Sequence, residues 1–229
     1  DEKTADMTAD ERARAVKKII ETVKKEEAVA AGIVSSLDSV TAMGNSRGIF
    51  QFHRQSEIEC SITALYGSAT GWAKAHATKA SQIDVEKLAR QAAEKARMGA
   101  DPQDIAPGRY LTILEPAAVL DLLAFLWWDF AATSHLDELS SLRDKLGQKV
   151  FSEKLTVRDD VHYKLQAGAP FDGEGLARQM VSLVENGVFK TIVSGRRAAA
   201  QGDFPLTNHG LVEPDSFGEM PLNIVVEGG

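Results

Sequence analysis

The chain has 229 residues, of which 44% are hydrophobic and 26% charged, as is usual for a globular protein with one or two domains. Its formal net charge of -7 argues against a nucleic-acid partner, because binding to phosphates needs a clustered basic surface. The single cysteine, Cys60, excludes an internal disulfide, and no apolar run has the length of a bilayer. With no signal peptide visible at the start, we expect a cytoplasmic protein without a membrane partner.

The first half of the chain predicts a helix, a group of strands and a second helix. Thr8 and Glu11 form a capping-box pattern, so we expect a helix over residues 9–30. Alternating apolar and polar residues then indicate an antiparallel meander, with strands at residues 33–43, 49–53, 57–66 and 71–80. Asp84 should open the second helix, and Gly99 should end it.

The next segment predicts a buried strand and an unusually apolar helix. Residues 110–114 have the composition of a short strand, and Pro116 lies where the first turn of a helix accepts proline. The helix expected over residues 117–131 is apolar nearly all round. Such a helix is normally buried on most sides, against a sheet or a partner subunit. Trp127 and Trp128 project about 100° apart on it, which favours association over burial within one domain.

The last third contains a clear hairpin signal. Asn186-Gly187 supplies the two positive-φ residues of a type I′ turn between alternating strands. A short helix over residues 196–201, stopped by Gly202, follows. The sequence therefore predicts an α+β fold whose largely antiparallel sheet is covered by two helices. We expect the sheet at residues 32–81 and 156–193 and the helices at 85–98 and 117–131.

Several segments together resemble the TldD/PmbA family, once called modulators of DNA gyrase and now regarded as metallopeptidases. The resemblance begins with the acidic glycine loop, hairpin and Arg-Ala-Ala-Ala segment within residues 168–202. It also includes Asn45-Ser46-Arg47-Gly48, Pro107-Gly108-Arg109-Tyr110 and Lys145-Leu146-Gly147, in the order found in the family. The old gyrase name has no support from the net charge.

The resemblance also implies a division into domains. Residues 1–31 would form an N-terminal helix and linker, residues 32–211 a central α+β domain, and residues 212–229 a truncated tail leading to a missing C-terminal region. Family members are about twice this length. The chain is therefore expected to be the middle of such a protein or a short relative.

The zinc motif of the family has no counterpart at the aligned positions. Catalytic members carry H-E-x-x-x-H on the helix after the proline-bearing turn, where the two histidines share a zinc ion and the glutamate activates its water. Ala124 and Phe125 fall at the first histidine and the glutamate, and Asp129 at the second histidine. A further cysteine ligand belongs to the C-terminal region. The resemblance therefore implies no catalytic residue, no metal and no cofactor in this chain.

Other metal-ligating or nucleophilic candidates favour structural roles. The five histidines are scattered without an H-x-x-x-H spacing. His135-Leu136-Asp137-Glu138 is the densest ligand-like cluster, but its place after an apolar helix favours contact with the last carbonyls of that helix. Cys60 falls on the inward side of a predicted strand, which favours packing as a small hydrophobic residue.

The acidic loop leaves two interpretations open. Asp172 and Glu174, with Asp159 and Asp160 upstream, can bind metal or transfer protons, yet Asp and Gly are also what a turn requires. By resemblance, the loop lies near a peptide-binding cleft. Cleft or interface candidates are therefore Asp172, Glu174, Phe171, Trp127 and Trp128.

The function implied by the resemblance is that of a PmbA/TldE-like, non-catalytic subunit. It would complete a cleft for short or unfolded peptides in a TldD-type zinc metallopeptidase complex. The partner is then a TldD-type catalytic subunit, a second copy, or both, together with peptide. The alternative is an independent binding protein or divergent enzyme that reuses the scaffold without zinc. A third option is a divergent zinc site.

Overall fold

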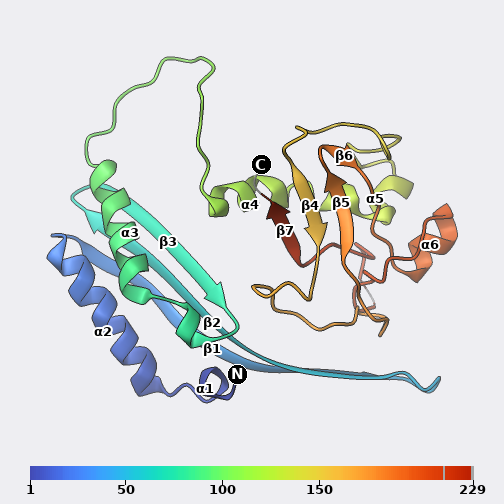
Figure 1. The fold of residues 1–229 in the computed structure, drawn as a ribbon, viewed down its shortest axis with the longest axis horizontal. Helices are drawn as coiled ribbons and strands as arrows, with labels where there is room; N and C mark the ends of the chain where they lie inside the picture. Colours follow the sequence, from blue (N-terminus) through green and yellow to red (C-terminus); the bar gives the residue numbers. More distant parts are fainter. Residues whose placement is uncertain (214, 228–229) are drawn as a thin grey trace. The chain divides into compact units, whose positions relative to one another are not determined.

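The computed structural model describes residues 1–213 and 215–227. The chain forms two compact units: Asp1–Ser39 with Arg54–Ile113 make the first, and Val40–His53 with Leu114–Gly229 make the second. Each unit contains helices and a sheet with antiparallel pairing (Figure 1). The predicted α+β class is confirmed, with two sheets in place of one. The boundaries expected near residues 31 and 211 do not coincide with this division.

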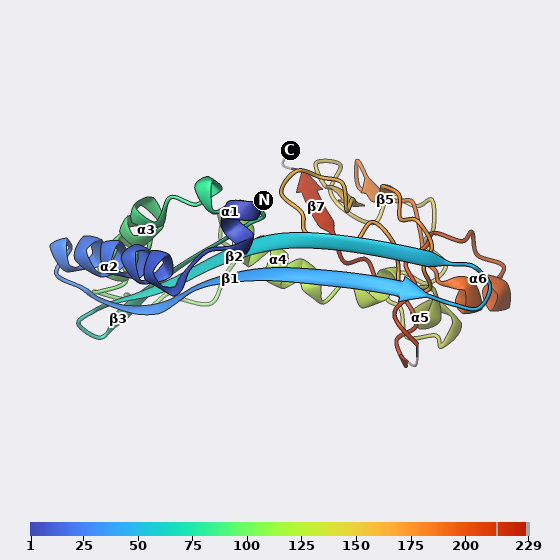
Figure 2. The ribbon, with the colours of Figure 1, turned by 90° about the horizontal axis from the view of Figure 1, so that it is seen from below.

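The first unit is a three-stranded sheet with two long helices. Its elements are α1 (Glu2–Ala5), α2 (Ala9–Lys25), β1 (Val29–Gly44), β2 (Phe50–Tyr66), β3 (Ala69–Ala77), η1 (Ala80–Gln82) and α3 (Val85–Met98). The strand order is β1-β2-β3, and Figure 2 shows β1 and β2 side by side in one long hairpin whose far end belongs to the second unit. The expected strands at 49–53 and 57–66 are one continuous strand, β2.

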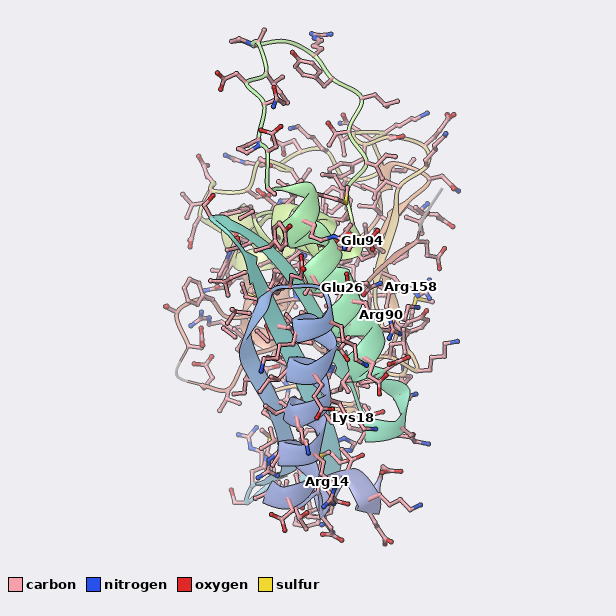
Figure 3. The ribbon with its side chains drawn as sticks, turned by 90° about the vertical axis from the view of Figure 1, so that its left-hand side faces the viewer. Arg14, Lys18, Glu26, Arg90, Glu94 and Arg158 are labelled. Atoms are coloured by element: carbon pink, nitrogen blue, oxygen red, sulfur yellow. The ribbon has the colours of Figure 1, made fainter. Side chains whose placement is uncertain are left out.

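The core of the first unit lies between one sheet face and the helices α2 and α3. Alternate residues of β2, among them Cys60 and Ile62, are buried against apolar residues of both helices. A Cβ atom on Gly71 of β3 would overlap the carbonyl oxygen of Ala92, so glycine lets α3 lie directly on the strand. The solvent side of α2 and α3 carries charged residues (Figure 3), including Arg14, Lys18, Arg90 and Glu94.

The local signals at the ends of these helices are confirmed. Thr8 accepts a hydrogen bond from the Glu11 amide, and the Glu11 carboxylate accepts one from the Thr8 amide. Asp84 caps α3, which ends at Gly99. Helix α2 ends at Lys25, five residues before the expected end, because Glu27 takes a left-handed conformation (φ 57°) that turns the chain into β1.

The second unit contains a four-stranded sheet in the order β6-β5-β4-β7. Its elements are α4 (Pro116–Ala124), η2 (Trp128–Phe130), α5 (Ala132–Leu136), β4 (Thr156–Asp159), β5 (Val181–Glu185), β6 (Val188–Phe189), α6 (Arg196–Gly202) and β7 (Ile224–Glu227). The sequence did not predict β7, which pairs antiparallel with β4. Phe130, Leu183, Phe189 and Val193 lie at the centre of the core.

The hairpin between β5 and β6 is confirmed. Asn186 and Gly187 have φ values of 48° and 79°, the left-handed pair that a type I′ turn needs. Helix α6 continues through Gly202, which the sequence predicted as its stop. It ends at Asp203, which itself takes the left-handed conformation with φ 53°.

Two predictions for residues 110–131 are wrong. The helix expected over residues 117–131 stops at Ala124, because Ala131 must be extended to bond with Val193 beside the sheet. Helix α4 has no residue buried within this chain, and Phe125 at its end is 81% exposed, so burial against a partner subunit stays a prediction. The strand expected at residues 110–114 is not formed, since this segment has no strand partner among the described residues.

Candidate functional site

A buried charge network lies in the second unit where β4 ends. Asp159 is fully buried, and its Oδ1 atom lies 2.5 Å from Arg178 Nη2 and 3.3 Å from His209 Nε2. Its Oδ2 atom accepts a hydrogen bond from the Asn223 amide at 2.8 Å. The side chain of Asn223 accepts from Arg178 Nη1 at 2.6 Å. The network joins segments that are 19 to 64 residues apart in sequence.

The electrostatics of this network keep Asp159 ionised. Burial alone would raise the pKa of Asp159, but contact with His209 and the positive charge of Arg178 outweigh it, so this pKa lies below its ordinary value. Burying charges is expensive unless each is paired and hydrogen-bonded. Here both oxygens of the carboxylate have partners, and these contacts connect the loops that supply them.

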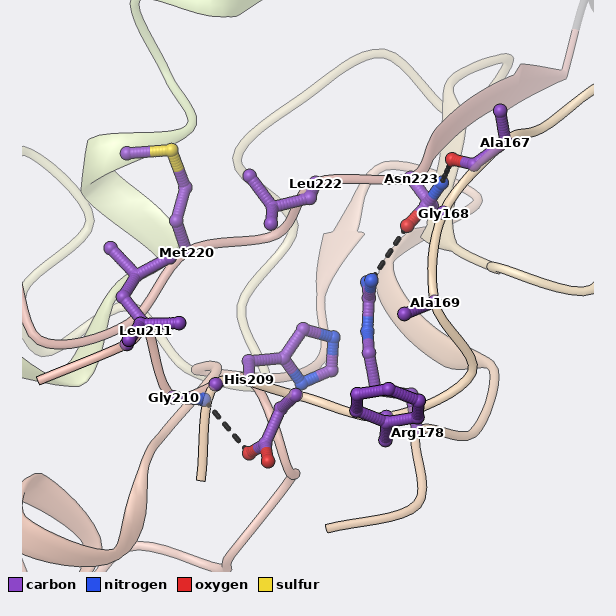
Figure 4. A pocket seen from close by; sticks show the side chains of 14 residues that line it. Ala167, Gly168, Ala169, Arg178, His209, Gly210, Leu211, Met220, Leu222 and Asn223 are labelled. Carbon is purple, nitrogen blue, oxygen red and sulfur yellow. Dashed lines mark hydrogen bonds between the residues drawn. The ribbon is translucent and has the colours of Figure 1, made fainter. Parts of the chain in front are cut away.

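A recess of about 260 Å³ lies above this network (Figure 4). Its polar base includes Arg178, His209 and Asn223, and most of its remaining surface is apolar. The apolar lining comes from three stretches of chain and includes Ala169, Phe171, Leu211, Val212, Met220 and Leu222. All of these residues belong to the second unit. The recess is the candidate functional site.

Asp172 builds the loop that forms one wall of the recess. Its Oδ1 atom accepts hydrogen bonds from the amides of Glu174 and Leu176, and its Oδ2 atom accepts one from the Gly210 amide at 3.1 Å. A carboxylate with three backbone donors is held in place and is poorly suited to transferring a proton. Asp172 therefore lines the recess and shapes it.

The other predicted cleft and interface residues are divided between different places. Phe171 lines the recess beside Asp172. Glu174 does not line it, because its carboxylate accepts a hydrogen bond from the Arg196 amide at the start of α6. Trp127 packs against the core of the second unit, and the Trp128 ring lies 4.3 Å from that of Phe217. Neither tryptophan lines the recess.

The residues that the sequence analysis expects at the positions of the zinc motif do not fit a zinc ion. Ala124 and Phe125 carry no donor atom, and the chain is no longer α-helical between Phe125 and Asp129. The Asp129 carboxylate accepts a hydrogen bond from the Ser141 amide. Within the part of the chain that the structure describes, no three His, Cys, Asp or Glu side chains lie close enough together to hold a metal ion.

The two remaining candidates, His135 and Cys60, have contacts that fit structural roles. His135 Nε2 lies 2.8 Å from the Asp129 carbonyl oxygen, and burial is the main reason that its pKa is lowered. Its contact with a carbonyl upstream agrees with the predicted structural role. Cys60 packs inward as predicted, and burial raises the pKa of its thiol to about 11. At neutral pH this thiol is not a nucleophile.

The residues that form the base of the recess were not predictable from the sequence. Arg178, His209 and Asn223 belong to no local motif, and they meet only when the sheet and the loops around it have formed. Asp159 was noted as one of two adjacent carboxylates. The other, Asp160, accepts a hydrogen bond from the His162 amide in its own turn.

The comparisons with known proteins decide the family. Residues 107–227 match the model described as the PmbA/TldA metallopeptidase C-terminal domain, and residues 1–99 match that of the central domain. The chain belongs to the PmbA/TldD family. The two matches divide the chain near residue 100.

The relatives agree with this assignment. A Methanocaldococcus jannaschii protein, MJ0231, is 30% identical over 178 residues, which are 76% of this chain and 42% of that protein. Among solved structures, TM0727 of Thermotoga maritima has a TM-score of 0.87 at 22% identity, over 97% of this chain and 53% of its own. TldE of Thermococcus kodakarensis has a TM-score of 0.80 at 23% identity, over 99% and 54%. The chain spans about half the length of these relatives.

None of the described helices is both long enough and apolar enough to cross a bilayer.

Proposed function

We propose that this chain is part of a PmbA/TldE-like, non-catalytic subunit of a TldD-type zinc metallopeptidase complex that acts on short or unfolded peptides. The observation that carries the proposal is the chemistry of the three positions that match the zinc motif. Ala124 and Phe125 have no donor atom, and Asp129 uses its carboxylate to hold the Ser141 amide. Catalysis would then be supplied by the partner.

An exposed apolar surface supports association with a partner. Helix α4 has no buried residue, although its sequence is apolar, and Leu122 and Phe125 are 59% and 81% exposed. Large apolar surfaces of this kind mark interaction sites in soluble proteins. The similarity to TldE of Thermococcus kodakarensis is the reason to look for a TldD-type partner first.

The recess supports a role in binding peptide. It is apolar over most of its lining, it has a few convergent polar groups at its base, and its walls are tied together by hydrogen bonds. Preformed recesses of this composition are the usual binding sites for organic ligands. Phe171 and Asp172 are the proposed cleft residues, and Trp127 and Trp128 are proposed to support the association surface.

The test is reconstitution with a TldD-type catalytic subunit. The chain alone should cleave no unfolded peptide, and the mixture should cleave it in a zinc-dependent reaction while both proteins sediment together. Changing Phe125, which is exposed, to Asp should weaken co-sedimentation, whereas the same change at exposed Leu206 should not. A strict monomer under all conditions would contradict the proposal.

A second test asks whether the motif positions could be converted into a zinc site. The triple variant Ala124→His, Phe125→Glu and Asp129→His should bind no stoichiometric zinc, because α4 ends at Ala124 and the new side chains do not share one helix face. About one zinc per chain in this variant would show that the loss of the motif residues is the whole difference from a catalytic subunit.

The second candidate function is that of an independent binding protein without zinc. It is favoured by one observation: every residue that lines the recess belongs to the second unit of this chain. Peptide binding by the chain alone, with no effect of a TldD-type subunit on affinity or sedimentation, would favour this candidate. A divergent enzyme would instead cleave peptide alone in the presence of a chelator.

A further inference from the structure

We propose that the recess above the buried network is a specificity pocket that receives one uncharged, mainly apolar side chain of a bound peptide. The inference rests on the proposed peptide-binding function and adds what the recess selects. It follows from three properties of the recess: its walls are preformed, its lining is mainly apolar, and its carboxylates are already used. Each property can be read from contacts within the second unit.

Hydrogen bonds between the segments that form the walls hold the recess in its open shape. Asn223 Nδ2 donates to the Ala167 carbonyl oxygen at 2.8 Å, which fixes the first wall to the strand β7 region. The Asp172 carboxylate and the Gly173 amide bind Gly210, which fixes the acidic loop to the second wall. The Met220 amide donates to the His209 carbonyl oxygen at 3.2 Å. A recess tied in this way does not have to be opened by its ligand.

The lining suits an apolar side chain. Phe171 is buried at the wall, while Val212 and Leu222 are 66% and 58% exposed and bring apolar surface to the mouth. A ligand that covers these side chains removes apolar surface from water on both partners. A glycine at the same peptide position would leave the apolar lining of the recess exposed to water.

The base excludes a basic side chain. Asp159 Oδ1 is shared by Arg178 and His209, and its Oδ2 binds the Asn223 amide. The two oxygens of Asp172 bind three backbone amides. A lysine entering the recess would therefore meet Arg178 and His209 and find no free carboxylate. Its charge would lose water without a replacement partner.

The base of the recess is closed by buried polar side chains. Arg178 is 6% exposed and lines the recess, and its Nε atom is buried. Figure 4 shows the Arg178 guanidinium and the His209 ring at the base, with Asn223 bonded to the former.

The test uses acetylated pentapeptides Ala-Ala-X-Ala-Ala with a fluorescent label, where X is Leu, Gly or Lys, and measures anisotropy with the chain alone and with its TldD-type partner. The Leu peptide should bind about 10-fold more tightly than the Gly peptide, as burial of one leucine side chain implies. The Lys peptide should bind no better than the Gly peptide.

Two variants connect this preference to the recess. Ala169→Phe fills the recess and should remove the advantage of the Leu peptide, whereas Ala200→Phe on the exposed face of α6 should retain it. Leu222→Asp adds a carboxylate at an exposed part of the wall and should reverse the order, so that the Lys peptide binds most tightly. Leu206→Asp is the matched control, because Leu206 is also exposed, at 48% against 58% for Leu222, but lies outside the recess.

The outcomes separate this inference from the function on which it rests. Equal binding of the three peptides, unchanged by Ala169→Phe and Leu222→Asp, would overturn the specificity pocket and leave peptide binding intact. Failure of every peptide to bind, both to the chain and to the mixture, would overturn the proposed function and the pocket together.

Discussion

The two units of this chain bury different kinds of side chain. In the first unit, the buried polar residues are Thr4, Thr22 and Ser56, and the rest of the interior is apolar. In the second, Asp159, Asp172, Arg178, His209 and Glu219 are all buried. Each described carboxylate or guanidinium that is buried therefore lies in the unit that also contains the recess.

This difference indicates which of the two units presents a binding surface. Apolar packing is enough to hold two helices on a sheet, as the first unit shows. A network of buried charges gives little net stability compared with apolar residues of the same size, so its value lies in fixing loops in one arrangement. We infer that the first unit is a scaffold and that the second presents a preorganised binding surface.

The largest expected effect comes from breaking the network at its centre. Asp159→Ala leaves Arg178 and His209 buried without their carboxylate partner. We therefore expect the free energy of unfolding to fall by about 3–5 kcal/mol. Urea denaturation monitored by tryptophan fluorescence measures it. Glu185→Ala, which removes the exposed ion pair with Lys190, should cost less than about 1 kcal/mol. Equal losses of unfolding free energy in the two variants would show that the buried network does not stabilise the fold more than an exposed ion pair.

A smaller effect should follow from overfilling the first unit. Gly71→Ala places a Cβ atom against the Ala92 carbonyl of α3, and overpacking of this kind costs about 1–3 kcal/mol. Gly99→Ala is the matched control, since the nearest atom to its new Cβ would be 3.5 Å away. If thermal unfolding midpoints of the two variants are the same, α3 does not lie directly on β3.

A still more gradual effect is expected in acid. Because the pKa of Asp159 is lower in the folded chain than its ordinary value of 3.8, its stabilising contribution is complete above about pH 4. It is lost as the pH falls further, through the folded-state pKa. Between pH 4 and 2, the free energy of unfolding should therefore fall more steeply for the wild type than for Asp159→Asn. Parallel curves would mean that this pKa is not lowered.

The features that were predictable from the sequence are those that depend on neighbours along the chain. The capping box at Thr8 and Glu11 satisfies backbone groups within three residues, and Asn186-Gly187 needs only its own φ angles. Most of strand β2 was predictable, as two shorter strands, because alternate residues such as Cys60 face one core. In each case the local preference and the fold agree.

The features that were missed depend on distant partners. Helix α4 stops at Ala124 because Ala131 pairs with Val193, a contact 62 residues away that no local pattern reveals. The recess was not predictable for the same reason, since Arg178 and His209 are brought together by contact with Asp159, which is distant in the sequence. The acidic loop was found, but its sequence did not show that Asp172 is used by backbone amides.

The most direct test of the account is the zinc content and peptidase activity of the purified chain, measured alone and after mixing with a TldD-type catalytic subunit. The account predicts that this chain is metal-free and inactive alone, and that zinc and activity in the mixture come from the partner, because Ala124 and Phe125 offer zinc no donor. About one zinc per chain together with peptide cleavage by the chain alone would contradict it.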